Sequence, residues 1–199
     1  MHDFLFKCVE GHCNIIVSGE TGSGKTELVK YLASHTKENE KIITIEDTLE
    51  LHLDKIFPHR DIVAMKTNNI ASYSDVLVTC MRQNPRWILL SEVRSAEAVQ
   101  FLKTIHRYIH LGVHVKGYMS KKYGRFQREI VEVAEFYVDD DNEARCNVLY
   151  SKGMDGVEVY HNPSKRLLDY LDAQGIYLPR ETFVKESETL KESENIEII

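Results

Sequence analysis

Eight residues near the amino terminus carry the chemistry on which the rest of this sequence depends. They match the pattern G-x-x-x-x-G-K-[ST] at every fixed position. Glycines let the backbone curl so that successive N–H groups point at phosphate oxygens, and the start of a following helix adds its positive dipole end. The motif predicts a phosphate-binding loop, in which Lys25 reaches the β- and γ-phosphates and Thr26 holds Mg²⁺. The predicted binding residues are Gly19, Glu20, Thr21, Gly22, Ser23, Gly24, Lys25 and Thr26.

The segments on either side of this loop are those that a phosphate-binding loop requires. Asn14 to Ser18 is an apolar run that predicts a strand, and Glu27 to His35 has the pattern of a helix, with Leu28, Val29 and Leu32 on one side. A surface turn rich in Gly, Ser and Thr could match the motif by chance. The strand before the loop and the helix after it favour a nucleotide site instead.

Two further predicted strands end in carboxylates, at the edge where open α/β sheets bind their ligands. The strand 41–45 leads into the acidic stretch Glu46 to Glu50. The apolar run Trp87 to Leu90 leads through Ser91 to Glu92, which resembles a Walker B element whose acid faces Mg²⁺ or the attacking water. Solvated acidic turns after buried strands are the alternative interpretation of both stretches.

The composition fits one ordinary globular domain: 199 residues, of which 43% are hydrophobic and 28% charged. Because the net charge is −6, no direct binding of nucleic acid is predicted. Apolar runs such as Trp87 to Leu90 are far shorter than the roughly 20 residues that span a bilayer, and no secretory signal pattern is present. We therefore expect a soluble, cytosolic protein.

Cysteines and histidines give weaker signals. The cysteines contain no C-x-x-C pair, so they predict neither a zinc site nor a disulfide scaffold, and we expect them to be reduced. Three histidines fall at helical i, i+4 spacing and could in principle hold a metal, although packed or exposed side chains are the simpler interpretation. The residues concerned are Cys8, Cys13, Cys80 and Cys146, with His106, His110 and His114.

The pattern along the chain predicts an α/β fold with a mostly parallel sheet, flanked by helices and continued by an antiparallel extension. We expect one domain over 1–178 and an acidic, mobile tail over 179–199. Further strands are predicted at Ile62–Met65, Val113–Met119, Glu129–Val138, Ala144–Tyr150 and Val157–Tyr160, and further helices at Ser74–Gln83, Ser95–Ile109 and Ser164–Ala173.

Three stretches, in this order and spacing, resemble the type II/type IV secretion traffic ATPases, which include conjugation and pilus motors. They are Asn14 to Thr26, Ile43 to Leu51, which resembles the family's acidic box, and Ser91 to Arg94, which resembles its Walker B. The resemblance runs from about Phe4 to about Tyr150. It implies a RecA-like P-loop NTPase core that uses ATP and Mg²⁺.

The same resemblance implies roles for particular residues and partners. Lys25 and Thr26 would bind phosphate and Mg²⁺, Glu92 would support the metal, and either Glu46 or Glu50 would position the water, with Arg94 beside them. Members form hexameric rings at the cytosolic face of a membrane-embedded transfer machine. Each subunit also carries an N-terminal sensor domain, which this sequence is expected to lack.

Several positions depart from the family pattern. Ser91 and Ser95 replace glycines, Arg86 replaces an aspartate, and the expected histidine box is reduced to the stretch from His110 to Tyr118. The leading hypothesis is a motor ATPase. Two alternatives stay open: a regulatory or assembly subunit that binds nucleotide but turns it over weakly, and a small-molecule P-loop kinase with Arg125 or Arg128 as a lid arginine.

Overall fold

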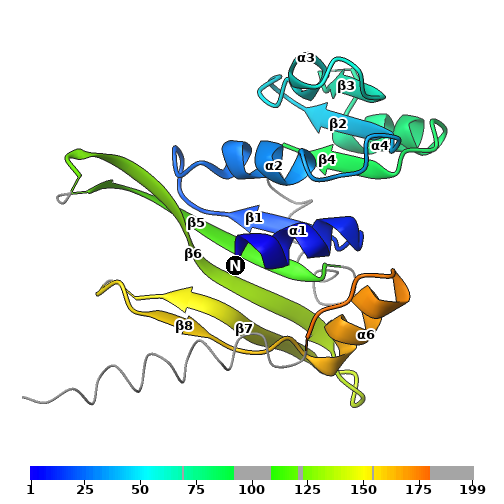
Figure 1. Ribbon diagram of the computed structural model, residues 1–199. Helices are drawn as coiled ribbons and strands as arrows, with labels where there is room; N and C mark the ends of the chain where they lie inside the picture. Colours follow the sequence, from blue (N-terminus) through cyan, green and yellow to red (C-terminus); the bar gives the residue numbers. More distant parts are fainter. Residues whose placement is uncertain (69, 92–108, 121–122, 154, 180–199) are drawn as a thin grey trace, which may run out of the picture. The chain divides into compact units, whose positions relative to one another are not determined.

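The computed structural model describes residues 1–68, 70–91, 109–120, 123–153 and 155–179, and its strands form one parallel and one mainly antiparallel sheet (Figure 1). The predicted α/β class with an antiparallel part is confirmed. The helices are α1 (His2–Glu10), α2 (Lys25–Ala33), α3 (Leu53–Ile56), α4 (Tyr73–Met81) and α6 (Lys165–Ala173), and the strands are β1 (Ile15–Ser18), β2 (Ile42–Glu46), β3 (Ile62–Lys66), β4 (Trp87–Leu90), β5 (Leu111–Ser120), β6 (Arg125–Val138), β7 (Ala144–Lys152) and β8 (Glu158–Tyr160).

The chain divides into two compact units, residues 1–25 with 102–199 and residues 26–101. The second unit contains the parallel sheet, in the order β3-β2-β4. Its central strand β2 is buried along its whole length and sends alternate side chains to opposite faces. Ile42 packs with Leu51 and Leu53 on one face, while Ile43 and Ile45 pack with Val76 and Cys80 on the other. Both faces of β2 therefore carry a hydrophobic core.

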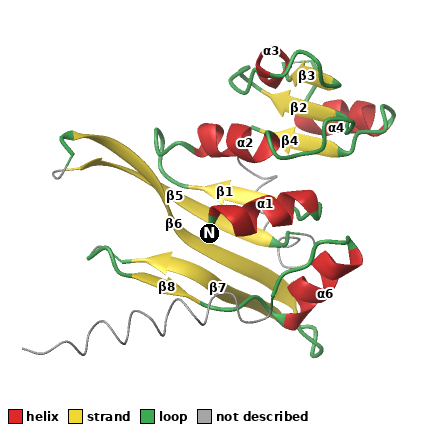
Figure 2. Ribbon diagram, viewed as in Figure 1, coloured by secondary structure: helices red, strands yellow, loops and turns green. Residues whose placement is uncertain are grey.

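The first unit contains the sheet β1-β5-β6-β7-β8, in which β1 and β5 are parallel and the later pairs antiparallel. β5 and β6, of 10 and 14 residues, run together as a long hairpin (Figure 2). Their register shifts between His114 and Val115, which face Glu132 and Ile130, so Val131 has no residue opposite it. This is a β-bulge, a device that bends a strand and re-aims its side chains.

A buried carboxylate fastens α6 to the hairpin of the first unit. Glu135 is 2% exposed and accepts hydrogen bonds from the backbone N–H of Ser164 at 2.9 Å and from its hydroxyl. Ser164 also caps α6, since its Oγ accepts from the N–H of Leu167 at 3.2 Å. At the other end, the Tyr170 hydroxyl donates to the carbonyl of His12 at 3.1 Å, so α6 is anchored at both ends.

The structure differs from the sequence prediction in how the strands combine. We expected one continuous sheet, but among the described residues β1 pairs only with β5, and β2 to β4 form a sheet of their own. The single domain predicted over 1–178 stays a prediction. The helix predicted at Ser95–Ile109 falls largely, and the tail beyond Pro179 wholly, outside the described residues. Within the described ranges, no helix is long and apolar enough to cross a membrane.

Candidate phosphate-binding site

The predicted phosphate loop follows β1 directly, and glycine is favoured at two of its positions. The backbone φ angles are +150° at Gly19, +80° at Gly22 and +97° at Gly24, a region that side chains disfavour. A Cβ at Gly19 would lie 2.3 Å from the carbonyl oxygen of Val115 in β5, and one at Gly24 would lie 2.6 Å from Cδ of Arg128 in β6. At Gly19 the neighbour is backbone, so only glycine fits there, whereas at Gly24 the exposed Arg128 side chain could move and the positive φ angle is what favours glycine.

Lys25 turns back onto this loop. Its Nζ donates hydrogen bonds to the carbonyl of Gly19 at 2.9 Å and to that of Glu20 at 2.8 Å, while the N–H of Ser23 donates to Glu20 at 3.1 Å. A cation is thus held against a curled backbone, as phosphate binding requires. Glu20, Thr21 and Gly22 are exposed on the loop.

Ser23 is the loop residue with unused hydrogen-bonding capacity. It is 2% exposed, and its Oγ has no hydrogen-bond partner in the described part of the chain. A buried hydroxyl without a partner is costly in a folded protein. An oxyanion bound in the loop would satisfy this hydroxyl, so the residues present fit a phosphate group.

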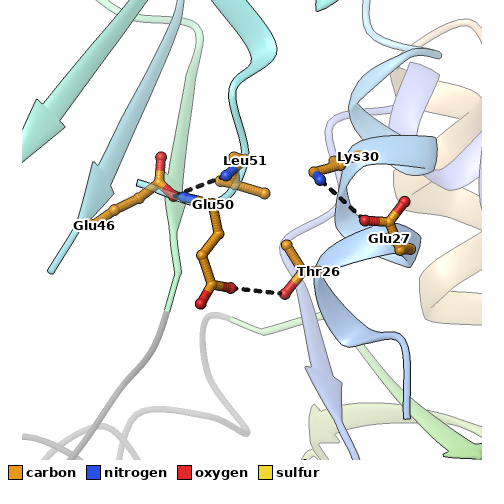
Figure 3. A network of polar contacts seen from close by, with 6 residues as sticks. All are labelled: Thr26, Glu27, Lys30, Glu46, Glu50 and Leu51. Carbon is orange, nitrogen blue, oxygen red and sulfur yellow. Dashed lines mark hydrogen bonds and ion pairs between the residues drawn. The ribbon is translucent and has the colours of Figure 1, made fainter. Parts of the chain in front are cut away.

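The two glutamates that the sequence left equivalent differ sharply in the structure (Figure 3). Glu46 is fully buried, and its carboxylate accepts from Oγ1 of Thr44 at 2.9 Å, from the N–H of Glu50 at 2.7 Å and from the N–H of Leu51 at 3.0 Å. Its oxygens hold the acidic loop in place. The geometry therefore gives Glu46 a structural role inside the protein.

Glu50, in contrast, is exposed and faces the first residues of α2 (Figure 3). Its Oε2 accepts a hydrogen bond from Oγ1 of Thr26 at 3.3 Å, while Lys30 of the same helix is paired with Glu27 at 2.9 Å. A hydroxyl and a carboxylate are the hard oxygen donors that Mg²⁺ prefers. The structure therefore brings Thr26 and Glu50 together as a fitting donor set for that ion.

The Walker B residues can be placed only up to the end of β4. Ser91 follows that strand, donates its N–H to the carbonyl of Ile45 at 3.1 Å and lies 3.3 Å from the Tyr73 hydroxyl. Glu92 and Arg94 lie outside the described residues. Their predicted roles stay predictions.

The two histidines of the expected histidine box lie beside opposite ends of β1 and are hydrogen-bonded to residues there. Nδ1 of His114 is hydrogen-bonded to Oγ of Ser18 at 2.9 Å, directly before the phosphate loop. Nδ1 of His110 accepts from the N–H of Asn14 at 2.9 Å, at the start of the strand. His114 lies within β5, in agreement with the strand predicted at Val113–Met119, and His110 lies just before it, so this pair does not lie on a helix. Only His114 adjoins the loop.

Burial gives His110 a testable pH dependence. The ring packs on Tyr170 at a centroid distance of 4.4 Å, and burial lowers the pKa of His110. Protonation then favours the unfolded chain, so stability is full above the ordinary pKa of about 6.5 and falls as the pH drops towards the folded value. Urea unfolding should show that the free energy of unfolding falls less between pH 7.5 and pH 5 in His110→Asn than in the parent protein. The asparagine keeps an acceptor for the N–H of Asn14. Equal losses in both proteins would contradict this role.

Arg128 contacts the phosphate loop in a way that the sequence does not predict. The sequence suggests it only as a lid arginine, whereas in the structure Nε of Arg128 donates to the carbonyl of Gly22 at 3.4 Å. The two residues are 106 positions apart, and they meet because β6 returns alongside β5, which itself pairs with β1. The long cation-rich hairpin was the available signal, but sequence alone does not give its register.

Comparison with known proteins agrees with this geometry. A family model described as "Type II/IV secretion system protein" matches residues 1–114. The type IV secretion system protein PtlH of Bordetella pertussis is 37% identical over 105 residues, which cover 51% of this chain and 31% of that protein. VirB11 of Bartonella quintana is 38% identical over 109 residues, with coverages of 52% and 30%. An uncharacterised protein of Bacillus anthracis is 39% identical over 105 residues, with coverages of 53% and 24%. The matches thus span a quarter to a third of these relatives.

Solved structures show the same likeness. The VirB11 ATPase of the Brucella suis type IV secretion system, in complex with sulphate, aligns with a TM-score of 0.57 and 26% identity, covering 67% of this chain and 51% of that one. The Legionella pneumophila ATPase DotB aligns with a TM-score of 0.54 at 17% identity, covering 70% and 49%, which shows the fold alone. Because the family model matches more than half of the sequence, this chain belongs to the type II/IV secretion system ATPase family.

Proposed function

We propose that this chain is the ATP-binding and ATP-hydrolysing motor domain of a type II/IV secretion or conjugative transfer system. The observation that carries the proposal is the loop from Gly19 to Lys25, whose glycines take positive φ angles and whose lysine folds onto it. Family membership supports this proposal, and so does the sulphate, a tetrahedral oxyanion, in the related VirB11 ATPase structure.

The residues present suit both ATP and Mg²⁺. Lys25 and the backbone of the loop would bind the phosphates, and the buried hydroxyl of Ser23 would gain a partner there. Thr26 and Glu50 would hold the metal ion, whose charge offsets that of the phosphates during transfer. Glu92 stays our proposed Walker B acid, with Arg94 beside it, on the family pattern.

We assign the water-positioning role to Glu50 rather than Glu46. Both oxygens of Glu46 already accept hydrogen bonds inside the protein, and the side chain is fully buried. Glu50 is exposed and accepts only from Thr26 among the described residues. A carboxylate must reach the water that it orients, and Glu50 meets that condition.

The larger setting follows from the family. A homo-hexameric ring, a place at the inner face of the cell membrane and a membrane-embedded transfer machine as partner are proposals for the whole protein. The named relatives PtlH and VirB11 are type IV secretion system proteins, which favours that machine.

The test is steady-state phosphate release from ATP with and without Mg²⁺, compared with the binding of ATP and ADP. A motor ATPase should release phosphate only with the metal and prefer ATP over ADP. The regulatory alternative predicts binding without release, and it is favoured by the reduced histidine box. His114→Ala helps to separate the motor ATPase from the regulatory subunit. If this variant loses the preference for ATP over ADP, His114 takes the role of the family's histidine box. His110→Ala should retain the preference.

A further inference from the structure

The β5–β6 hairpin approaches the phosphate loop closely at several points, all within the first unit. The Val115 carbonyl lies against Gly19, and Arg128 lies against Gly24. Between them, a Cβ at Gly117 would come within 3.1 Å of the Cα of Ser23. The hairpin is therefore the surface on which the loop is shaped, and it extends well past residue 114, where the family match ends.

Arg128 is the charged member of this contact. Nε of Arg128 donates to the carbonyl of Gly22, and its guanidinium carbon lies 5.4 Å from the ring centroid of Phe126 on the same strand. That ring in turn lies against Gly117, where an added Cβ would be 2.6 Å from it. A stacked guanidinium loses less freedom on binding than a free one. The side chain is thus pre-positioned beside the loop.

The contact also fixes the direction of a peptide group. In a trans peptide the C=O and the next N–H point opposite ways. With the carbonyl of Gly22 held towards β6, the N–H of Ser23 points away from β6 and donates to Glu20 across the loop. Lys25 engages the carbonyls of Gly19 and Glu20 in the same manner. Two cations therefore hold three carbonyls of one short loop.

Arg128 also has donors to spare. Across the described ranges, neither Nη atom of its guanidinium has an acceptor, and the side chain is exposed. A triphosphate brings several negative charges to the loop, whose own acid is Glu20. A second cation beside Lys25 lowers the electrostatic cost of that charge and offers N–H groups in a planar fork.

We propose that Arg128 is a positioning residue of the nucleotide site, which orients the phosphate loop through the carbonyl of Gly22 and, with Lys25, supplies its positive charge. This inference rests on the proposed nucleotide binding. It assigns a role in that site to β6, which carries none of the sequence motifs named above.

The experiment measures ATP and ADP affinities by titration calorimetry at about 0.15 M salt, where long-range charge effects are screened. Arg128→Ala should bind ATP about tenfold more weakly, with a smaller loss for ADP, which carries less charge. Arg128→Lys, which keeps the cation, should recover most of the loss. Arg125→Ala removes an exposed cation from the same strand, and no hydrogen bond joins Arg125 to the loop in the described part of the chain, so this variant should bind like the parent protein.

Two further measurements separate the possible outcomes. The unfolding midpoint of Arg128→Ala without nucleotide should stay within about 2 °C of the parent, because the side chain is exposed. Parent-like ATP affinity in Arg128→Ala, or an equal loss in Arg125→Ala, overturns the assignment. Lys25→Ala is titrated in parallel: if it loses ATP while Arg128→Ala does not, only the role of Arg128 fails, and if neither loses ATP, the proposed function fails as well.

Discussion

Replacing Lys25 by alanine is expected to weaken ATP binding at least about a hundredfold. The ammonium is the cation held directly on the loop, through the carbonyls of Gly19 and Glu20. Charge-assisted hydrogen bonds contribute roughly 1.5–3 kcal/mol each, and about 1.4 kcal/mol corresponds to a factor of ten in affinity. Two lost phosphate contacts therefore suffice for the predicted effect, which titration calorimetry would measure.

Lys30→Ala is the matched control for this change. Lys30 lies on the same helix α2 but is paired with Glu27, and an exposed pair of this kind contributes little. The variant should bind ATP like the parent protein. If Lys25→Ala also binds like the parent, the loop does not bind phosphate and the proposed function is wrong.

The second large effect concerns turnover. Glu50→Gln should lower steady-state phosphate release by about a hundredfold while ATP affinity changes by no more than a few fold. The amide oxygen can still accept from Thr26, so the local geometry is kept, but the carboxylate charge available to metal and water is lost. Phosphate release at saturating ATP, measured beside binding, separates the two effects.

Glu46→Gln is the contrasting variant. Because this side chain is buried, we expect the substitution to lower the stability of the protein. Its two oxygens accept from three donors, and a glutamine could keep the two backbone bonds through its amide oxygen but would lose the negative charge that strengthens them. We expect a loss of roughly 2 kcal/mol in the free energy of unfolding, measured by urea denaturation. A parent-like turnover in Glu50→Gln together with a stable, inactive Glu46→Gln would reverse the assignment of the two glutamates.

The sequence predicts helices and strands well where the periodicity of hydrophobic residues and the residues next to them in the chain determine the structure. The strand expected at 41–45 is β2, at Ile42–Glu46, and the helix expected to begin at Ser164 is α6, capped by that serine. Both have a strong local signal, a continuous apolar run in one case and a capping residue before an amphipathic stretch in the other. The loop motif is equally local.

The sequence could not predict the contacts between segments that are far apart in the chain. Glu46 and Glu50 have the same chemistry, and only the fold buries one and exposes the other. β6 begins at Arg125, four residues before the predicted strand. The sequence does not predict these four residues as strand because Arg125 to Arg128 lacks the apolar alternation that marks one. Those four residues contain the arginine that reaches the loop, so the least strand-like part of β6 is the part that meets the site.

The bulge opposite His114 determines which side chain of β6 faces the phosphate loop. Side chains alternate between the two faces of a strand, so one extra residue exchanges the faces of everything on one side of it. Val131 is that extra residue, and Arg128 lies beyond it, towards the tip of the hairpin. Deleting Val131 would restore a regular ladder and leave Arg128 opposite Gly117, whereas a β6 that kept Val131 but paired without the bulge would turn the arginine to the opposite face of the sheet. The bulge therefore lets β6 carry one extra residue while Arg128 keeps its place beside the nucleotide loop.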